Sequence, residues 1–139
     1  MDGRHNKAIG ILCRIEKQKQ ENFLQKQRLL SKKILLLEEE KKMLKKHLHA
    51  EASLSSGIIF HKTFHHFKKV CEEKISVLCE ESQSFEREYS LVQKELDALY
   101  RKIKKYELIM DRQKEGERRQ MQKKEQENFD EIASVRFLL

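Results

Sequence analysis

Apolar residues recur through residues 57–110 in steps that alternate between four and three. This spacing places them along one face of a helix and is typical of the buried seam of a coiled coil. The polar positions are Lys74 and Ser82, and a doubled four-residue step between them marks a stutter, where the supercoil unwinds locally. The seam ends abruptly at Met110. Its positions are Phe60, Phe64, Phe67, Cys71, Lys74, Leu78, Ser82, Phe85, Tyr89, Val92, Leu96, Leu99, Ile103, Tyr106 and Met110.

The composition favours long solvated helices over a compact globule. Charged residues make up 38% of the 139 residues, Pro and Trp are absent, and the mean hydropathy is −0.80. Helices that bury only one stripe each enclose no cavity, so this composition argues against an active site. The net charge of +7 is spread along the chain, with an excess near the N-terminus. Such a surface favours acidic partners, or is simply an ordinary solvated helix face.

The cysteines and the apolar runs indicate a cytoplasmic protein. Cys71 and Cys79 would lie about 12 Å apart on one helix, too far for a disulfide. The three cysteines are therefore expected to be reduced. No window reaches eighteen apolar residues, so we expect neither a cleaved signal nor a membrane span.

The N-terminal segment carries a weaker seam of the same kind, with eight apolar residues among its twelve positions. Ser53, Ser55, Ser56 and Gly57 form a cluster of helix breakers between the two seams. We therefore predict one all-α domain, residues 1–139, built as an elongated antiparallel two-helix coiled-coil hairpin. Helix 1 would span about 5–52, the turn 53–57, and a longer, overhanging helix 2 about 58–128; a continuous helix with a polar interruption is the alternative. The first seam is Ile9, Cys13, Glu16, Gln20, Phe23, Gln27, Leu30, Ile34, Leu37, Lys41, Leu44 and Leu48.

A hairpin also determines which residues face each other. With a turn centred near residue 55, partner numbers add to about 110, which places Leu37 near Glu73 and Phe23 near Arg87. Helix 1 then ends opposite residues 101–108, and residues 111–128 project as an unpaired charged helix. Local pairs such as Glu115 with Arg119 would hold it. Residues 129–139 carry apolar residues at helical spacing and are predicted to form a docking segment, with folding back onto helix 1 as the alternative.

No catalytic motif is present in the sequence. We find no glycine-rich phosphate loop and no nucleophile beside a base, so we expect no catalysis and no cofactor. His61 and His65 share a helix face, with His47 and His49 near them across the turn, but zinc sites usually recruit Cys or carboxylate as well, and no metal site is predicted. Residues 112–124 form the densest basic run and match no nucleic-acid-binding motif. Binding of nucleic acid is a lesser alternative.

The C-terminal segment resembles a known family. Residues 110–137 read MDRQKEGERRQMQKKEQENFDEIASVRF, in which an Asp-Arg-Gln step precedes a charged helix and an Asp-Glu pair precedes an aliphatic residue and Ala. These positions are Asp111, Arg112, Gln113, Asp130, Glu131, Ile132 and Ala133. Together with the two-helix layout, this segment resembles the FliJ/YscO family, the coiled-coil stalk proteins of bacterial type III export machines in flagella and injection apparatuses.

The resemblance implies a function without catalysis. Family members resemble the central shaft of rotary ATPases: the end with both termini sits in the pore of the hexameric export ATPase, promotes its assembly and activity, and links it to the cytoplasmic domain of the export gate protein. Export chaperones are further partners. The resemblance implies a cytoplasmic position, peripheral to the inner-membrane export apparatus and without insertion into the membrane. Residues 9–23 and 111–137 would face the ATPase, with Arg112, Gln113, Arg118, Arg119, Phe129, Asp130, Glu131, Ile132, Ala133 and Arg136 as its contacts.

A generic oligomeric coiled-coil adaptor is the competing hypothesis, because the second seam could pair with a copy of itself. The hairpin is expected to be a monomer when free. A concentration-dependent oligomer would favour the adaptor.

Overall fold

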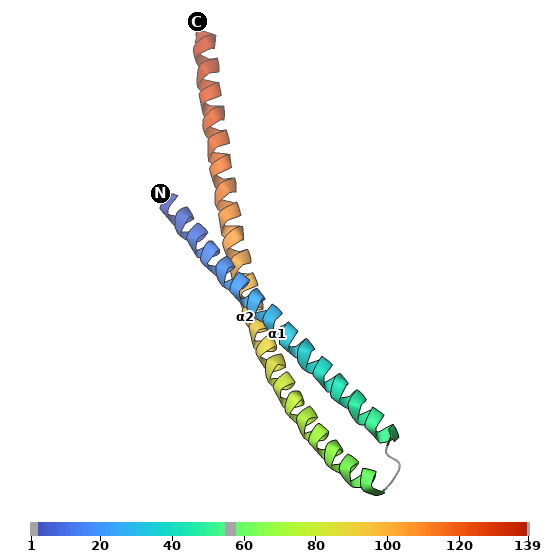
Figure 1. The fold of residues 1–139 in the computed structure, drawn as a ribbon. Coiled ribbons are helices and arrows are strands. Elements are labelled where there is room, and N and C mark those ends of the chain that lie inside the picture. The colour runs from blue at the N-terminus through green and yellow to red at the C-terminus, as the bar shows by residue number, and fades with distance from the viewer. Residues whose placement is uncertain (1–2, 55–57, 139) are drawn as a thin grey trace. The chain divides into compact units, whose positions relative to one another are not determined.

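The computed structural model describes residues 3–54 and 58–138, which form two long α-helices. Helix α1 comprises Gly3–Leu54 and helix α2 comprises Ile58–Leu138 (Figure 1). Without proline, neither helix has the residue that would break it most strongly. The two helices pack against each other, which confirms the all-α class and the two-helix hairpin with a longer second helix.

Near its end, α1 carries a hydrogen bond from a side chain to its own backbone. The Ser53 hydroxyl donates a hydrogen bond of 2.7 Å to the carbonyl oxygen of Ala50. Serine near the end of a helix often bonds in this way to a backbone carbonyl one turn earlier. The other residues predicted for the turn, 55–57, lie outside the described residues.

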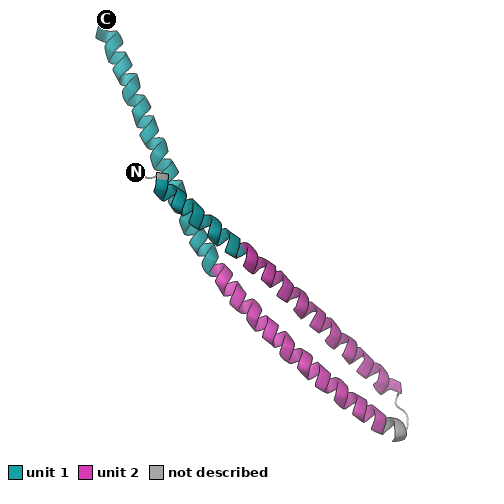
Figure 2. Ribbon diagram, turned by 60° about the vertical axis from the view of Figure 1, so that its left-hand side comes forward, with its two compact units in different colours: residues 1–20, 98–139 teal, residues 21–97 magenta. Residues whose placement is uncertain are grey.

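The chain divides into two compact units, which Figure 2 shows in different colours. Unit 1 combines residues 1–20 with residues 98–139, and unit 2 comprises residues 21–97. Within each unit, a segment of α1 packs antiparallel against a segment of α2.

The predicted seams form the packed core of each unit. Every position of the first seam is buried or half-buried. In unit 2, Leu30 of α1 forms a buried cluster with Val92 and Leu96 of α2, against which Phe23, Leu24, Phe85 and Tyr89 pack. In unit 1 the buried apolar residues are Ile9, Cys13, Leu99 and Ile103.

One predicted seam position of α2 is wrong. Lys74 is exposed, and Ile75, one residue further on, is half-buried. Lys74 begins the stutter, where an extra step of four residues turns the buried face around the helix. The charged side chain therefore reaches solvent, and the apolar neighbour takes its place. The side chain of Phe60, the first seam position, lies outside the described residues.

The register between the helices differs from the prediction by about ten residues. In unit 2, Gln27 Nε2 donates to Gln93 Oε1 at 2.6 Å and Ser82 Oγ donates to Glu38 Oε1 at 3.4 Å, so partner numbers add to 120. The pairing of Leu37 with Glu73 is therefore wrong, as is that of Phe23 with Arg87. Buried polar groups need hydrogen-bond partners, and the observed register gives them to Gln27 and Ser82 in the seam.

The overhang of α2 also begins later than predicted. In unit 1, Asn6 Nδ2 donates a hydrogen bond of 3.1 Å to Glu117 Oε1, and Lys17 lies 3.4 Å from Glu107. Helix α1 thus reaches residue 117, not residues 101–108. Every residue from 118 to 138 is exposed, and this part of α2 continues past the first residues of α1 (Figure 2). We call residues 118–138 the unpaired tail.

Glu38 and Lys41 of unit 2 form an ion pair that shifts the pKa of both side chains. Lys41 Nζ lies 3.0 Å from Glu38 Oε1. The hydrogen bond from Lys41 holds the pKa of the Glu38 carboxyl below its ordinary value of 4.5, and the same bond raises the pKa of Lys41 above 10.5. Because the pKa of Glu38 is lowered by folding, its contribution to stability is present above about pH 4.5 and is lost as the pH falls through the lowered value.

The substitution Lys41→Met should raise the pKa of Glu38 back toward 4.5, because it removes the largest of the interactions that lower this pKa. The measurement is a pH titration of the Glu38 carboxyl carbon by NMR. Lys42→Met, which removes the neighbouring exposed lysine, is the control and should leave the titration unchanged. Equal titration curves for the wild type and Lys41→Met would contradict this prediction.

Candidate partner-binding segment

The residues predicted to contact a partner lie on one continuous helix. Helix α2 runs without interruption from Ile58 to Leu138, so residues 111–138 are helical throughout. They all belong to unit 1. Their surroundings nevertheless differ, because the first seven lie beside α1 and the remainder form the unpaired tail.

The first part of the segment is still packed against α1. Gln113 is half-buried, and its Oε1 atom is buried without a hydrogen-bond partner among the described residues. The Oδ1 atom of Asn6, near the start of α1, is likewise buried without a hydrogen-bond partner among the described residues. Gln113 therefore belongs to the seam of unit 1, whereas the neighbouring Arg112 is exposed.

Two arginines at the start of the tail are held along the helix by one glutamate. Arg118 Nη2 lies 2.8 Å from Glu115 Oε1, and Arg119 Nε lies 3.6 Å from the same atom. The predicted pair of Glu115 with Arg119 is thus confirmed. Exposed pairs of this spacing stabilise a helix by a few tenths of a kcal/mol each. Each guanidinium has five N–H groups, so both arginines keep donors for a partner.

Four of the predicted contacts, three of them apolar, share one face of the tail. A helix turns about 100° per residue, so Phe129, Ile132, Ala133 and Arg136 fall within roughly a third of its circumference. Ile132 is 58% exposed, and Phe129 is more exposed still. Asp130 and Glu131 lie off this face, and Asp130 accepts a hydrogen bond of 3.3 Å from Gln126 Nε2.

Two further exposed residues extend this apolar face, and the sequence reading missed both. Met121 lies eight residues before Phe129, and Val135 lies three residues after Ile132. Both spacings keep a side chain on the same side of a helix, which is the signal that could have identified them. We call Met121, Phe129, Ile132 and Val135 the tail face.

Charge is segregated along the segment. Residues 112–124 contain six basic residues against Glu115 and Glu117, whereas residues 125–131 contain four acidic residues and no basic one. A basic band is therefore followed by an acidic band and then by the last apolar residues.

The histidines considered for zinc are not brought together as expected. A partner sum of 120 places His47 level with residue 73 and His49 level with residue 71, away from His65. The side chain of His61 lies outside the described residues. In residues 3–54 and 58–138, no group of three or more His, Cys, Asp and Glu side chains could hold a metal ion.

No stretch within the described part of α1 or α2 is long and apolar enough to cross a membrane.

A helical hairpin that ends in a fully exposed helix with an apolar face defines an all-helical coiled-coil protein. Residues 12–139 match the family described as flagellar FliJ protein, and the chain belongs to that family. This membership points to flagellar type III protein export. Comparison with curated proteins and with solved structures gave no significant match.

Proposed function

We propose that this chain is the non-catalytic central stalk of the flagellar type III export apparatus, and that its unpaired tail enters the ring of the hexameric export ATPase. The observation that carries the proposal is the tail itself, twenty-one residues of helix on which every side chain is exposed. At 1.5 Å per residue it extends about 30 Å beyond the last contact with α1.

A lone helix suits the axis of a ring because all its faces can be contacted together. The tail face is apolar, whereas Asp130 lies on the opposite side of the helix. Ring subunits placed around the helix would meet different chemistry on each side. The basic and acidic bands add a charge pattern along the axis, which favours a defined depth of insertion.

The further partners rest on family membership. Within the proposal, the stalk promotes assembly and activity of the ATPase, links it to the cytoplasmic domain of the export gate protein, and contacts export chaperones at the cytoplasmic side of the inner membrane. Residues 9–20 belong to unit 1 with the tail, so they would lie on the ATPase side. Within the proposal, the chain has no catalytic role of its own.

The double substitution Phe129→Ser and Ile132→Ser tests the proposal. It removes the two largest apolar side chains in the middle of the tail face, and buried apolar anchors at interfaces contribute more than about 1 kcal/mol each. We expect binding to the purified export ATPase to weaken about 30-fold or more, with loss of its stimulated ATP hydrolysis. Co-purification and a hydrolysis assay measure the two effects.

Leu91→Ser is the matched control, because Leu91 is 61% exposed on α2 but lies in unit 2. It should leave ATPase binding unchanged. A chain ending at Glu117, which keeps the hydrogen bond to Asn6, should behave like the double variant. If either tail variant binds and stimulates the ATPase as the wild type does, the role assigned to the tail is wrong.

A further inference from the structure

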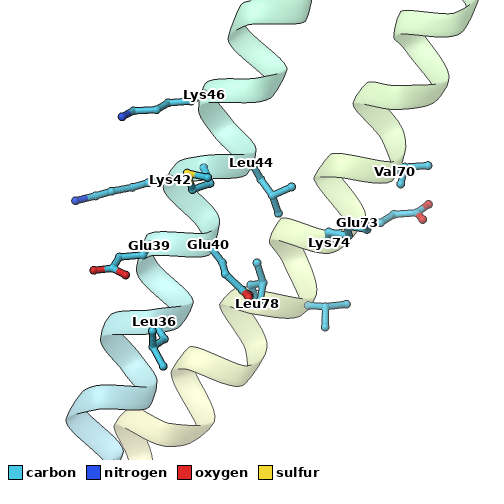
Figure 3. Close-up of a pocket in the computed structure, with 12 residues that line it drawn as sticks. Leu36, Glu39, Glu40, Lys42, Leu44, Lys46, Val70, Glu73, Lys74 and Leu78 are labelled. Atoms are coloured by element: carbon cyan, nitrogen blue, oxygen red, sulfur yellow. The ribbon is translucent and has the colours of Figure 1, made fainter.

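An apolar groove lies between α1 and α2 in unit 2, in the half of the unit near residues 54 and 58. Its volume is about 1180 Å³. The apolar lining comes from both helices, and Figure 3 shows Leu36 and Leu44 of α1 with Val70 and Leu78 of α2 around it. Met43 and Val77 complete this lining, and each exposes more than half of its side-chain surface. Contiguous exposed apolar surface of this kind usually marks an interaction site.

The exposed residues of the groove repeat every seven residues on both helices. Leu36 and Met43 are seven residues apart on α1, with the exposed Leu29 seven residues earlier. Val70 and Val77 have the same separation on α2. None of them belongs to the seams that hold the hairpin together. A seven-residue repeat of apolar side chains is the pattern that packs against further helices in a bundle.

We propose that this groove is a homodimer interface, in which a second copy of the chain lays its own groove over the first with the two α1 helices antiparallel. The charged residues on the rim of the groove favour a second copy of the chain as the binding partner. Glu39 and Lys46 flank Met43 and project, with Lys42, from the same side of α1 (Figure 3).

Antiparallel packing of α1 makes the rim complementary to itself. When Met43 lies opposite Met43 of the second copy, Glu39 comes within one residue, or about 1.5 Å along the axis, of the level of the second copy's Lys46. A twofold axis repeats the contact, so two Glu39–Lys46 pairs form. Parallel packing would instead place Glu39 against Glu39 and Lys46 against Lys46, which is repulsive.

The register of the hairpin allows the same twofold axis to place α2 against α2 of the second copy. Because partner numbers add to 120 in unit 2, Met43 lies level with Val77. A single twofold axis therefore packs the apolar stripe of α1 against the same stripe of the second copy. It packs the stripe of α2 against that of the second copy in the same way. The proposed dimer differs from the free monomer expected from the sequence. It does not rest on the proposed function, because the groove contains no residue of the tail.

A charge swap within one chain tests the proposal. Sedimentation equilibrium of the full chain, from micromolar to near-millimolar concentrations, should show a mass rising from 16.7 kDa toward twice that value. Lys46→Glu should weaken dimerisation about tenfold, because each of two pairs turns from attractive to repulsive. Glu39→Lys should do the same, and the double variant Glu39→Lys with Lys46→Glu should restore the wild-type affinity.

Restoration by the double variant identifies the second copy as the occupant, because a different partner would lose complementarity to both rim positions. A wild type that stays at 16.7 kDa throughout, or a double variant no better than the single ones, would overturn the proposal. Circular dichroism checks folding, and both substituted residues are exposed.

Cysteine cross-linking tests the position of the axis. Met43→Cys should give a disulfide-linked dimer under mild oxidation, since the axis places the two residues opposite each other. Met121→Cys is the matched control, because Met43 and Met121 are 59% and 65% exposed. Equal cross-linking of the two variants would rule out this interface.

Discussion

The substitution Leu96→Asp is expected to remove most of the helix content of the protein. Leu96 is 7% exposed and packs with Leu30 and Val92 at the centre of the buried cluster of unit 2. Removing a large buried apolar side chain costs about 2–5 kcal/mol, and placing a carboxylate among apolar groups adds to that cost. A pair of helices that buries one stripe each has little stability in reserve, because isolated helix segments are marginal in water. Far-UV circular dichroism during urea or thermal unfolding measures the effect.

Leu91→Asp is the control that distinguishes the loss of buried packing from the lower helix propensity of aspartate. The substitution is identical, and it lies on the same helix five residues away, but Leu91 is 61% exposed. Aspartate lowers helix propensity by at most about 0.7 kcal/mol relative to the best helix former, so this control should stay folded. Unchanged helix content and unfolding midpoint in Leu96→Asp would contradict the pairing of α1 with α2 around Leu30.

The seams could be predicted from the sequence because burial on a helix depends on local spacing. Alternating steps of four and three identified Leu30, Val92 and Leu96 before their partners were known, and these three residues form the buried cluster. Lys74 was misplaced for a local reason, since a stutter moves the buried face by about one residue.

The register could not be predicted in the same way, because seam spacing is compatible with several alignments of the two helices. The prediction relied on the position of the turn alone. The observed alignment is instead the one in which the polar seam residue Gln27 meets Gln93. The polar seam residues alone would not have indicated this alignment, because Gln93 and Glu38, the partners of Gln27 and Ser82, lie beside the seams and not in them.

The groove was not predicted, because its exposed residues lie outside the strongest apolar stripe of each helix. Leu36 and Met43, like Val70 and Val77, repeat every seven residues on a second face. This weaker repeat was visible in the sequence, but only the register shows that the stripes of α1 and α2 lie level and line one groove. The contacts assigned to the tail stay a prediction, because an unpaired helix shows what it exposes and not what it binds.

The substitution Glu16→Met should stabilise unit 1. Glu16 is 4% exposed, and its Oε2 atom is buried without a hydrogen-bond partner among the described residues. The Oε1 atom lies 3.6 Å from Lys19 Nζ and 3.4 Å from Lys102 Nζ, but both lysine side chains are more than half exposed. Pairs with solvated lysines return little of the free energy that desolvating the carboxylate costs. Replacing it with an apolar side chain of similar size should raise the free energy of unfolding by about 1–2 kcal/mol.

Glu21→Met provides the control, because Glu21 is an exposed glutamate five residues further along α1. Its effect should lie within about 0.5 kcal/mol of zero, as for most surface substitutions. The location of the effect is as informative as its size. Glu16→Met should slow amide hydrogen exchange more in residues 9–20, which pack on α2 just before the tail, than elsewhere. Loss of stability in Glu16→Met would mean that the two lysines more than offset the burial of the carboxylate. A gain confined to residues 9–20 would show that a polar seam keeps the end of the hairpin that carries the tail easier to open than the rest.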